Sequence, residues 1–357
     1  MKPVKKLKHL PKKVLTQFLK NRFPEFFELR SAIKRLRDNA SVEILTEIPC
    51  GNHRFPIQAV SLNFSNRADA PTLLIVGGVH GLERIGSQVA TGFLNSLSNY
   101  LPWDRITLKL LEEVRLVFIP ILNPSGVFLN RRSNANGVDL MRNSPIDAEP
   151  GKWWQIYRGH RISNHLPWFR GKASQGFEPE AQALVDFVKT HLFQSRLIVS
   201  LDIHSGFGAV DRLWCPYAKS QAPFYHLPEV YRLRTLLNRT HPNHVYQMEP
   251  QSLQYTTHGD LWDYLYDLYR EAQPNGVFLP LTLEMGSWNW LKKNPLQILR
   301  PLGLFHPIKV HRIRRTLRRH RTLFEFLTRA VASPEAWSIS TEQREPTLKE
   351  ARQFWKV

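Results

Sequence analysis

Apolar and polar positions alternate along the chain in two ways, and together they predict an α/β fold. Four short, mainly apolar runs are typical of strands buried on both faces of a sheet: residues 73–76, 114–121, 197–203 and 277–283. Between them, residues 85–97 and 179–193 place apolar side chains at helical spacing. Strands that alternate with helices predict a mostly parallel sheet covered by helices on both faces.

The first part of the chain has a different pattern. Residues 4–37 carry apolar side chains near the helical period, and Pro24 predicts a break between two helices. Val42–Thr46 and Phe55–Leu62 predict two strands joined across Gly51-Asn52. No internal repeat or low-complexity linker interrupts the chain.

We therefore expect three regions. A basic helical extension covers residues 1–40, one catalytic domain covers residues 41–330, and a tail covers residues 331–357.

Charge is concentrated at the two flanks of the predicted catalytic domain. The net charge is +19; residues 1–40 hold 12 Lys/Arg against 3 acids, and residues 301–330 hold 8 against 1. Residues 1–40 and 309–321 could therefore bind an anionic surface, which could be nucleic acid, lipid or an acidic protein. The alternative is that these residues form the solvated faces of packed helices, as the apolar stripe of residues 313–327 indicates.

Cysteine content and hydropathy limit the cellular setting. The two cysteines, Cys50 and Cys215, provide no disulfide framework, which is compatible with a reducing compartment. No segment has the uninterrupted apolar length of a transmembrane helix, and the lysine-rich start lacks the apolar core of a signal peptide. We expect a soluble, cytoplasmic protein.

Polar side chains with metal-binding chemistry follow three of the predicted strands. His80 and Glu83 lie three residues apart after the first strand, His204 ends the third, and Glu284 ends the fourth. The carboxyl ends of parallel strands meet at one edge of a sheet, where ligands bind. Two histidines and a glutamate, with a fourth position left to water, form the ligand set of a catalytic zinc ion.

Charge and position predict roles for the remaining polar residues. Zinc held by His80, Glu83 and His204 would activate a water, and Glu284 is the predicted general base and acid. Asp139 is expected to hydrogen-bond a ligand histidine. Arg132 is expected to stabilise an oxyanion, and Arg142 to pair with a substrate carboxylate.

At these residues the chain resembles the zinc metallocarboxypeptidases of the carboxypeptidase A and B type. The resemblance covers residues 80–286 and rests on five segments: His80–Glu83, Asn123–Gly126 with Arg132–Asn143, Leu201–Ser205, Tyr255–Asp263 and Thr282–Gly286. It implies a mixed sheet flanked by helices, one zinc ion, and removal of the C-terminal residue of a peptide. It also implies that Tyr255 closes over substrate and that Asn143 belongs to the substrate-binding loop.

Three positions depart from the family pattern. Met141 stands where an asparagine usually precedes the arginine, so one donor to a terminal carboxylate is missing. Leu82 replaces an arginine of the digestive members, and Ser125 replaces the usual aspartate of Asn-Pro-Asp-Gly.

Two other functions stay open. One is an amidohydrolase similar to aspartoacylases and succinylglutamate desuccinylases, which shares the zinc site but takes an N-acyl amino acid. The other is a catalytically weakened basic protein that binds nucleic acid or acidic partners. Met141 suggests this function, because it removes a donor to the substrate carboxylate.

Overall fold

An eight-stranded mixed sheet forms the centre of the computed structural model, which describes residues 12–152, 154–300 and 302–357. The strands are β1 (Ser41–Cys50), β2 (His53–Leu62), β3 (Thr72–Gly77), β4 (Arg115–Ile119), β5 (Leu197–Ser205), β6 (Asp211–Cys215), β7 (Tyr246–Pro250) and β8 (Val277–Met285). Their order is β1-β2-β4-β3-β5-β8-β6-β7. The four central strands β4, β3, β5 and β8 run parallel, whereas β2 and β6 join them in antiparallel pairs.

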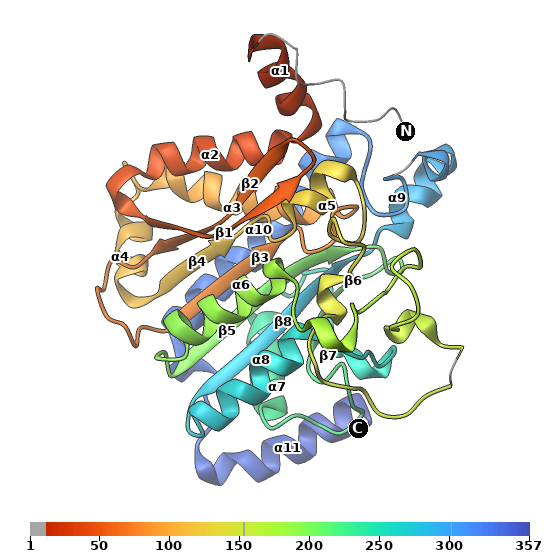
Figure 1. The fold of residues 1–357 in the computed structure, drawn as a ribbon. Coiled ribbons are helices and arrows are strands. Elements are labelled where there is room, and N and C mark those ends of the chain that lie inside the picture. The colour runs from red at the N-terminus through yellow and green to blue at the C-terminus, as the bar shows by residue number, and fades with distance from the viewer. Residues whose placement is uncertain (1–11, 153, 301) are drawn as a thin grey trace.

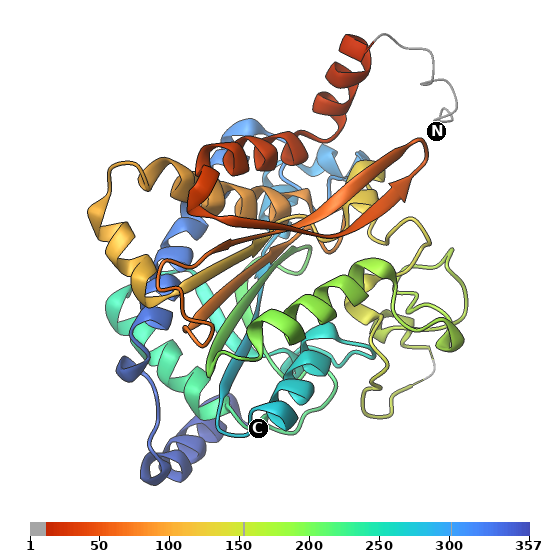
Figure 2. The ribbon, with the colours of Figure 1, turned by 60° about the vertical axis from the view of Figure 1, so that its left-hand side comes forward.

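Helices cover both faces of this sheet, so the predicted layered α/β class is confirmed (Figures 1 and 2). The longer helices are α1 (Lys12–Arg22), α2 (Pro24–Leu36), α3 (Arg84–Tyr100), α4 (Arg105–Glu113), α5 (Pro124–Leu129), α6 (Pro179–Phe187), α7 (Leu227–Thr240), α8 (Leu261–Ala272), α9 (Trp288–Lys293), α10 (Val310–Ala332) and α11 (Thr341–Trp355). One face carries α3 and α10, and the other carries α6 and α8. No helix in the described part of the chain is long and apolar enough to cross a membrane.

The apolar runs form the strands predicted from them because both faces of the central sheet are covered. Every residue of β3, β4 and β5 is buried, which explains why these segments lack an alternating polar face. The predicted hairpin is also present as β1 and β2, with Cys50 paired to His53 across the turn.

Several elements were not predicted because their sequences mix polar and apolar residues. β6 and the edge strand β7 are five residues long and contain charged positions such as Asp211 and Glu249. The predicted tail contains α11, which begins with a capping box at Ser340 and packs on α7, with Trp355 buried. The helical prediction for residues 4–11 lies outside the described residues.

A buried ion pair attaches α2 to α3. Glu25, which is fully buried, accepts a hydrogen bond from Arg84 Nε at 2.9 Å and another from Gln88 Nε2 at 2.9 Å. Arg84 also donates to the backbone carbonyl of Arg22. Arg84 follows the metal-ligand candidate Glu83 directly, so this pair also fixes the start of the helix that positions the site.

We predict that Glu25→Ala lowers the free energy of unfolding by about 3 kcal/mol, because it leaves the Arg84 guanidinium buried without a counter-charge. Equilibrium urea denaturation measures this change. Glu28→Ala, on the exposed side of the same helix, is the control and should change stability by no more than about 0.5 kcal/mol. Equal effects of the two substitutions would contradict a structural role for the pair.

Candidate metal centre and active site

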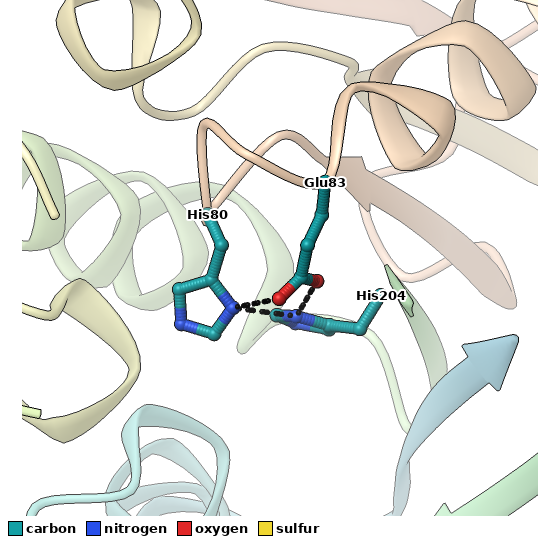
Figure 3. A group of neighbouring side chains, drawn as sticks. All are labelled: His80, Glu83 and His204. Atoms are coloured by element: carbon teal, nitrogen blue, oxygen red, sulfur yellow. Dashed lines mark hydrogen bonds and ion pairs between the residues drawn. The ribbon is translucent and has the colours of Figure 1, made fainter. Parts of the chain in front are cut away.

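His80, Glu83 and His204 converge at the carboxyl edge of the sheet (Figure 3). His80 Nδ1 lies 2.9 Å from Glu83 Oε1, and His204 Nδ1 lies 3.1 Å from Glu83 Oε2. The two histidine Nδ1 atoms are 3.2 Å apart, and all three side chains are buried. The fold therefore brings together the three residues that were predicted from the sequence to be metal ligands.

The outer nitrogen of each ring faces a carboxylate. His80 Nε2 lies 2.9 Å from Asp139 Oδ1, as predicted for Asp139. His204 Nε2 lies 2.8 Å from Asp202 Oδ2, an ion-pair contact too oblique for a good hydrogen bond. A carboxylate only accepts, so these outer nitrogens carry the ring protons and the two Nδ1 atoms present lone pairs.

Three side chains with electron-pair donors thus face one another in a buried space, and their repulsion is relieved by a metal ion between them or by a proton on His204. Two imidazole nitrogens and a carboxylate are the donor set of a catalytic zinc site, and the carboxylates behind the rings are the partners such ligands need. Burial alone would lower the pKa of His204, but Asp202 and Glu83 raise it well above its ordinary value. A proton and a metal ion therefore compete for this ring.

Two glycines allow the ligand segments to approach so closely. A Cβ at Gly86, in the first turn of α3, would lie 2.3 Å from the Ile203 carbonyl oxygen of β5. A Cβ at Gly81 would lie 1.9 Å from the Gly126 carbonyl carbon. Because glycine has no Cβ, the start of α3 packs directly against β5 at Gly86. The His80–Glu83 turn packs directly against the Asn123–Gly126 segment at Gly81. Asn123 fixes that segment, because it caps α5 through Gly126 N and donates to Val79 O.

Glu284 lies beside the three candidate ligands. It ends β8 in register with His204, and its Oε1 accepts a hydrogen bond from Phe207 N at 3.1 Å. Burial, followed by the charge of Glu83, raises the pKa of Glu284 to about 8. A carboxyl group with a raised pKa is suited to accept and return a proton near neutral pH.

A cleft of about 770 Å³ opens over this group and contains most of the predicted substrate-binding residues. Arg132 lines it and donates to Asp139 Oδ2 at 2.9 Å and to Glu83 Oε1 at 3.3 Å. Arg142 lines it as well, with Nε bonded to Tyr157 O and Nη1 to Asp139 Oδ2. Its Nη2 makes no hydrogen bond within the described chain, so it is available to a ligand.

Tyr255 also lines the cleft, in an aromatic group with Phe207, Trp214 and Tyr157. Arg158 holds the following residue, since it donates to the Thr256 carbonyl oxygen. The cleft therefore has a charged floor of arginines and carboxylates and an aromatic side.

Asn143, which was predicted to bind substrate, does not line this cleft. Its Nδ2 donates to Arg170 O at 3.0 Å and its Oδ1 accepts from Glu178 N at 2.6 Å, so both polar ends are used inside the protein.

Two of the three residues that depart from the family pattern lie at the cleft. Met141 and Leu82 line the cleft, and the Ser125 hydroxyl accepts a hydrogen bond from Ala135 N.

Asp202 is the functional residue that the sequence interpretation missed. It lies two positions before His204 in the same strand, and the two-residue period of a strand places both on one face. That spacing is the signal that could have identified it. Its Oδ2 also accepts a hydrogen bond from Trp262 Nε1 at 2.8 Å.

A model of the family described as zinc carboxypeptidase matches residues 53–287, which include the three candidate ligands and Glu284. The chain belongs to the zinc carboxypeptidase family.

Relatives in this family match a similar region. Carboxypeptidase SOL1 of Arabidopsis thaliana is 25% identical over 236 residues, and the carboxypeptidase N catalytic chain of Rattus norvegicus is 27% identical over 249 residues. Each match covers 64% of this chain, and 42% and 50% of the respective relative. The chain thus spans about half the length of these zinc carboxypeptidases.

Solved structures share the fold. Thrombin activatable fibrinolysis inhibitor superposes with a TM-score of 0.62 at 18% identity, covering 85% of this chain and 72% of that one. Carboxypeptidase A of Helicoverpa armigera gives a TM-score of 0.60 at 17% identity, covering 85% and 71%.

We predict that Asp202→Asn weakens zinc binding about 10- to 100-fold, because the neutral amide no longer stabilises the ring proton of His204. Competition with a chromophoric chelator measures the dissociation constant. The matched control is Asp186→Asn, an exposed aspartate on α6, which should leave zinc affinity unchanged. Unaltered affinity in Asp202→Asn would show that the carboxylate does not support the ligand.

Proposed function

We propose that this protein is a zinc-dependent carboxypeptidase that hydrolyses the C-terminal peptide bond of its substrate with one metal ion. The observation that carries the proposal is the convergence of His80, Glu83 and His204 in the same cleft as Glu284. Membership of the zinc carboxypeptidase family supports the same reaction class.

Zinc bound by these three residues would lower the pKa of a water molecule and polarise the substrate carbonyl. Glu284 takes the proton of the attacking water and returns it to the leaving amine as the C–N bond breaks. Arg132 supplies positive charge to the carbonyl oxygen as that oxygen becomes negative. Asp139 holds both Arg132 and the ring of His80, so one carboxylate positions the electrophile and a metal ligand.

Substrate orientation is assigned to Arg142 and Tyr255. The Nη2 group of Arg142 is the donor for a terminal carboxylate, and Tyr255 forms part of the aromatic side of the cleft. Met141 adds no donor beside Arg142, so more of the recognition depends on the arginine than in relatives with asparagine.

We also propose a cellular location and an anionic partner for this protein. The cytoplasmic location rests on Cys50 and Cys215, both of which are buried free thiols. Binding of an anionic partner by residues 1–40 and 309–321 rests on charge. On α10, the exposed Arg314, Arg315 and Arg318 have no acidic partner in the described chain.

Glu284→Gln should reduce kcat on a peptide library by a factor of about 10² to 10⁴, since the amide cannot carry the proton. Mass spectrometry of the products measures the change, and the zinc content should equal that of the unmodified protein. Glu325→Gln, on α10, is the control with full activity expected.

The products distinguish the other functions. Stepwise loss of C-terminal residues supports the carboxypeptidase. Release of an acyl group from N-acyl amino acids would instead establish the amidohydrolase. No turnover by the zinc-loaded protein would favour a weakened enzyme that binds its partners.

Arg142→Lys should lower kcat/KM on peptides with a free C-terminus by about tenfold or more, because one ammonium group cannot keep the bonds to Tyr157 O and Asp139 Oδ2 and also donate to a carboxylate as Nη2 does. Peptides of the same sequence with an amidated C-terminus are the matched substrates. They should be poor substrates of both proteins. Equal cleavage of the free and amidated peptides by the unmodified protein would contradict recognition of a terminal carboxylate.

A further inference from the structure

The segment after α9 exposes apolar side chains and buries a polar one. Leu296, Ile298 and Leu299 have exposed fractions of 75%, 57% and 80%, whereas Gln297 between them is 1% exposed. Scattered exposed apolar residues are normal, but a cluster that reverses the usual burial pattern marks an interaction site. We call residues 288–300 and 302–310 the outer loop. It projects from the edge of the molecule (Figure 1).

Internal contacts fix the direction of these side chains. Gln297 Nε2 donates to Gly303 O at 2.6 Å, and a Cβ at Gly303 would lie 1.6 Å from Gln297 O. Arg312 of α10 donates to the carbonyl oxygens of Trp290 and Lys293, so α9 is tied to the body of the protein. The loop therefore cannot bury its leucines by turning them inward without losing these bonds.

The charged residues near the exposed apolar residues in the sequence are all positive. Between Glu284 and Glu325 the sequence contains ten Lys/Arg and no acid. In the outer loop Lys292, Lys293, Arg300 and Lys309 are exposed, as is the ring of Trp288. Exposed aliphatic side chains and a tryptophan in a segment whose charged residues are all cations match the interface of a bilayer with anionic head groups.

We propose that the outer loop docks this protein on an anionic lipid surface. The aliphatic side chains enter the boundary between head groups and acyl chains, and the lysines and Arg300 contact the head-group phosphates. Nucleic acid would use the cations but offers nothing to three exposed aliphatic side chains, so lipid is the better match.

Docking would also determine where the cleft faces. Phe305 of the outer loop lines the cleft, and its carbonyl oxygen accepts a hydrogen bond from Ser205 Oγ at 2.6 Å. Ser205 N in turn donates to Glu83 Oε2 at 2.9 Å. The loop is thus attached next to two candidate metal ligands, and a docked protein would hold its cleft close to the membrane surface. The inference does not depend on the proposed peptidase activity.

Sedimentation with lipid vesicles tests the proposal on the full chain. The vesicles contain phosphatidylcholine alone or with about 30% phosphatidylglycerol, at about 0.1 M salt. We expect binding only to the anionic vesicles. The triple variant Leu296→Ser, Ile298→Ser, Leu299→Ser should bind at least about tenfold more weakly. The control is Ile106→Ser with Ile162→Ser, which removes exposed aliphatic side chains elsewhere (77% and 70% exposed) and should bind like the unmodified protein.

Three results would overturn the proposal. The first is failure of the unmodified protein to bind anionic vesicles. The second is undiminished binding by the triple variant, which would assign vesicle binding to other basic residues such as those in 1–40. The third is a dimer in sedimentation velocity that the triple variant converts to a monomer without a change in vesicle binding, which would make a second copy the occupant of this surface.

Discussion

The arrangement of the active site depends on the mutual repulsion of three lone-pair donors that the fold forces together. Two ring nitrogens and a carboxylate lie within about 3 Å of one another in a buried space, and the ring protons are directed away from it by Asp139 and Asp202. Such an arrangement is unfavourable without a cation and favourable with one. A metal ion bound there would therefore also help to hold the carboxyl edge of the sheet together.

Parallel pairing of the central strands makes this convergence possible. β3, β5 and β8 lie side by side, so the residues at their carboxyl ends reach the same space although they are far apart in the sequence. Register alone is insufficient, since Gly86 and Gly81 must also let α3 and the α5 segment approach. The buried pair of Glu25 and Arg84 then holds α3 from the other side. The N-terminal helix α2 thus supports the site although it lies outside the matched family region.

Two parts of this structure could be predicted from the sequence: the strands that have a continuous apolar pattern and the cluster of residues with metal-binding side chains. Continuous apolar runs predicted β3, β4, β5 and β8 correctly, and the residues that follow these strands predicted the ligand cluster. The strands β6 and β7 were missed because they are short and carry buried acids, Asp211 and Glu249, which tertiary contacts with Arg319 and Arg212 neutralise. The position of Asn143 was not predicted, because its neighbours in the chain line the cleft whereas its own side chain turns toward Arg170 and Glu178. Side-chain direction of that kind is set by tertiary packing and cannot be inferred from a motif.

Crystallographic anomalous scattering at the zinc edge tests the central claim most directly. On zinc-loaded protein, the account predicts a single strong peak about 2.0–2.2 Å from the Nδ1 atoms of His80 and His204 and from the carboxylate of Glu83. It also predicts that both Nε2 atoms still face Asp139 and Asp202. A peak at another group of side chains, ligation through Nε2, or no peak in fully loaded protein would contradict the account.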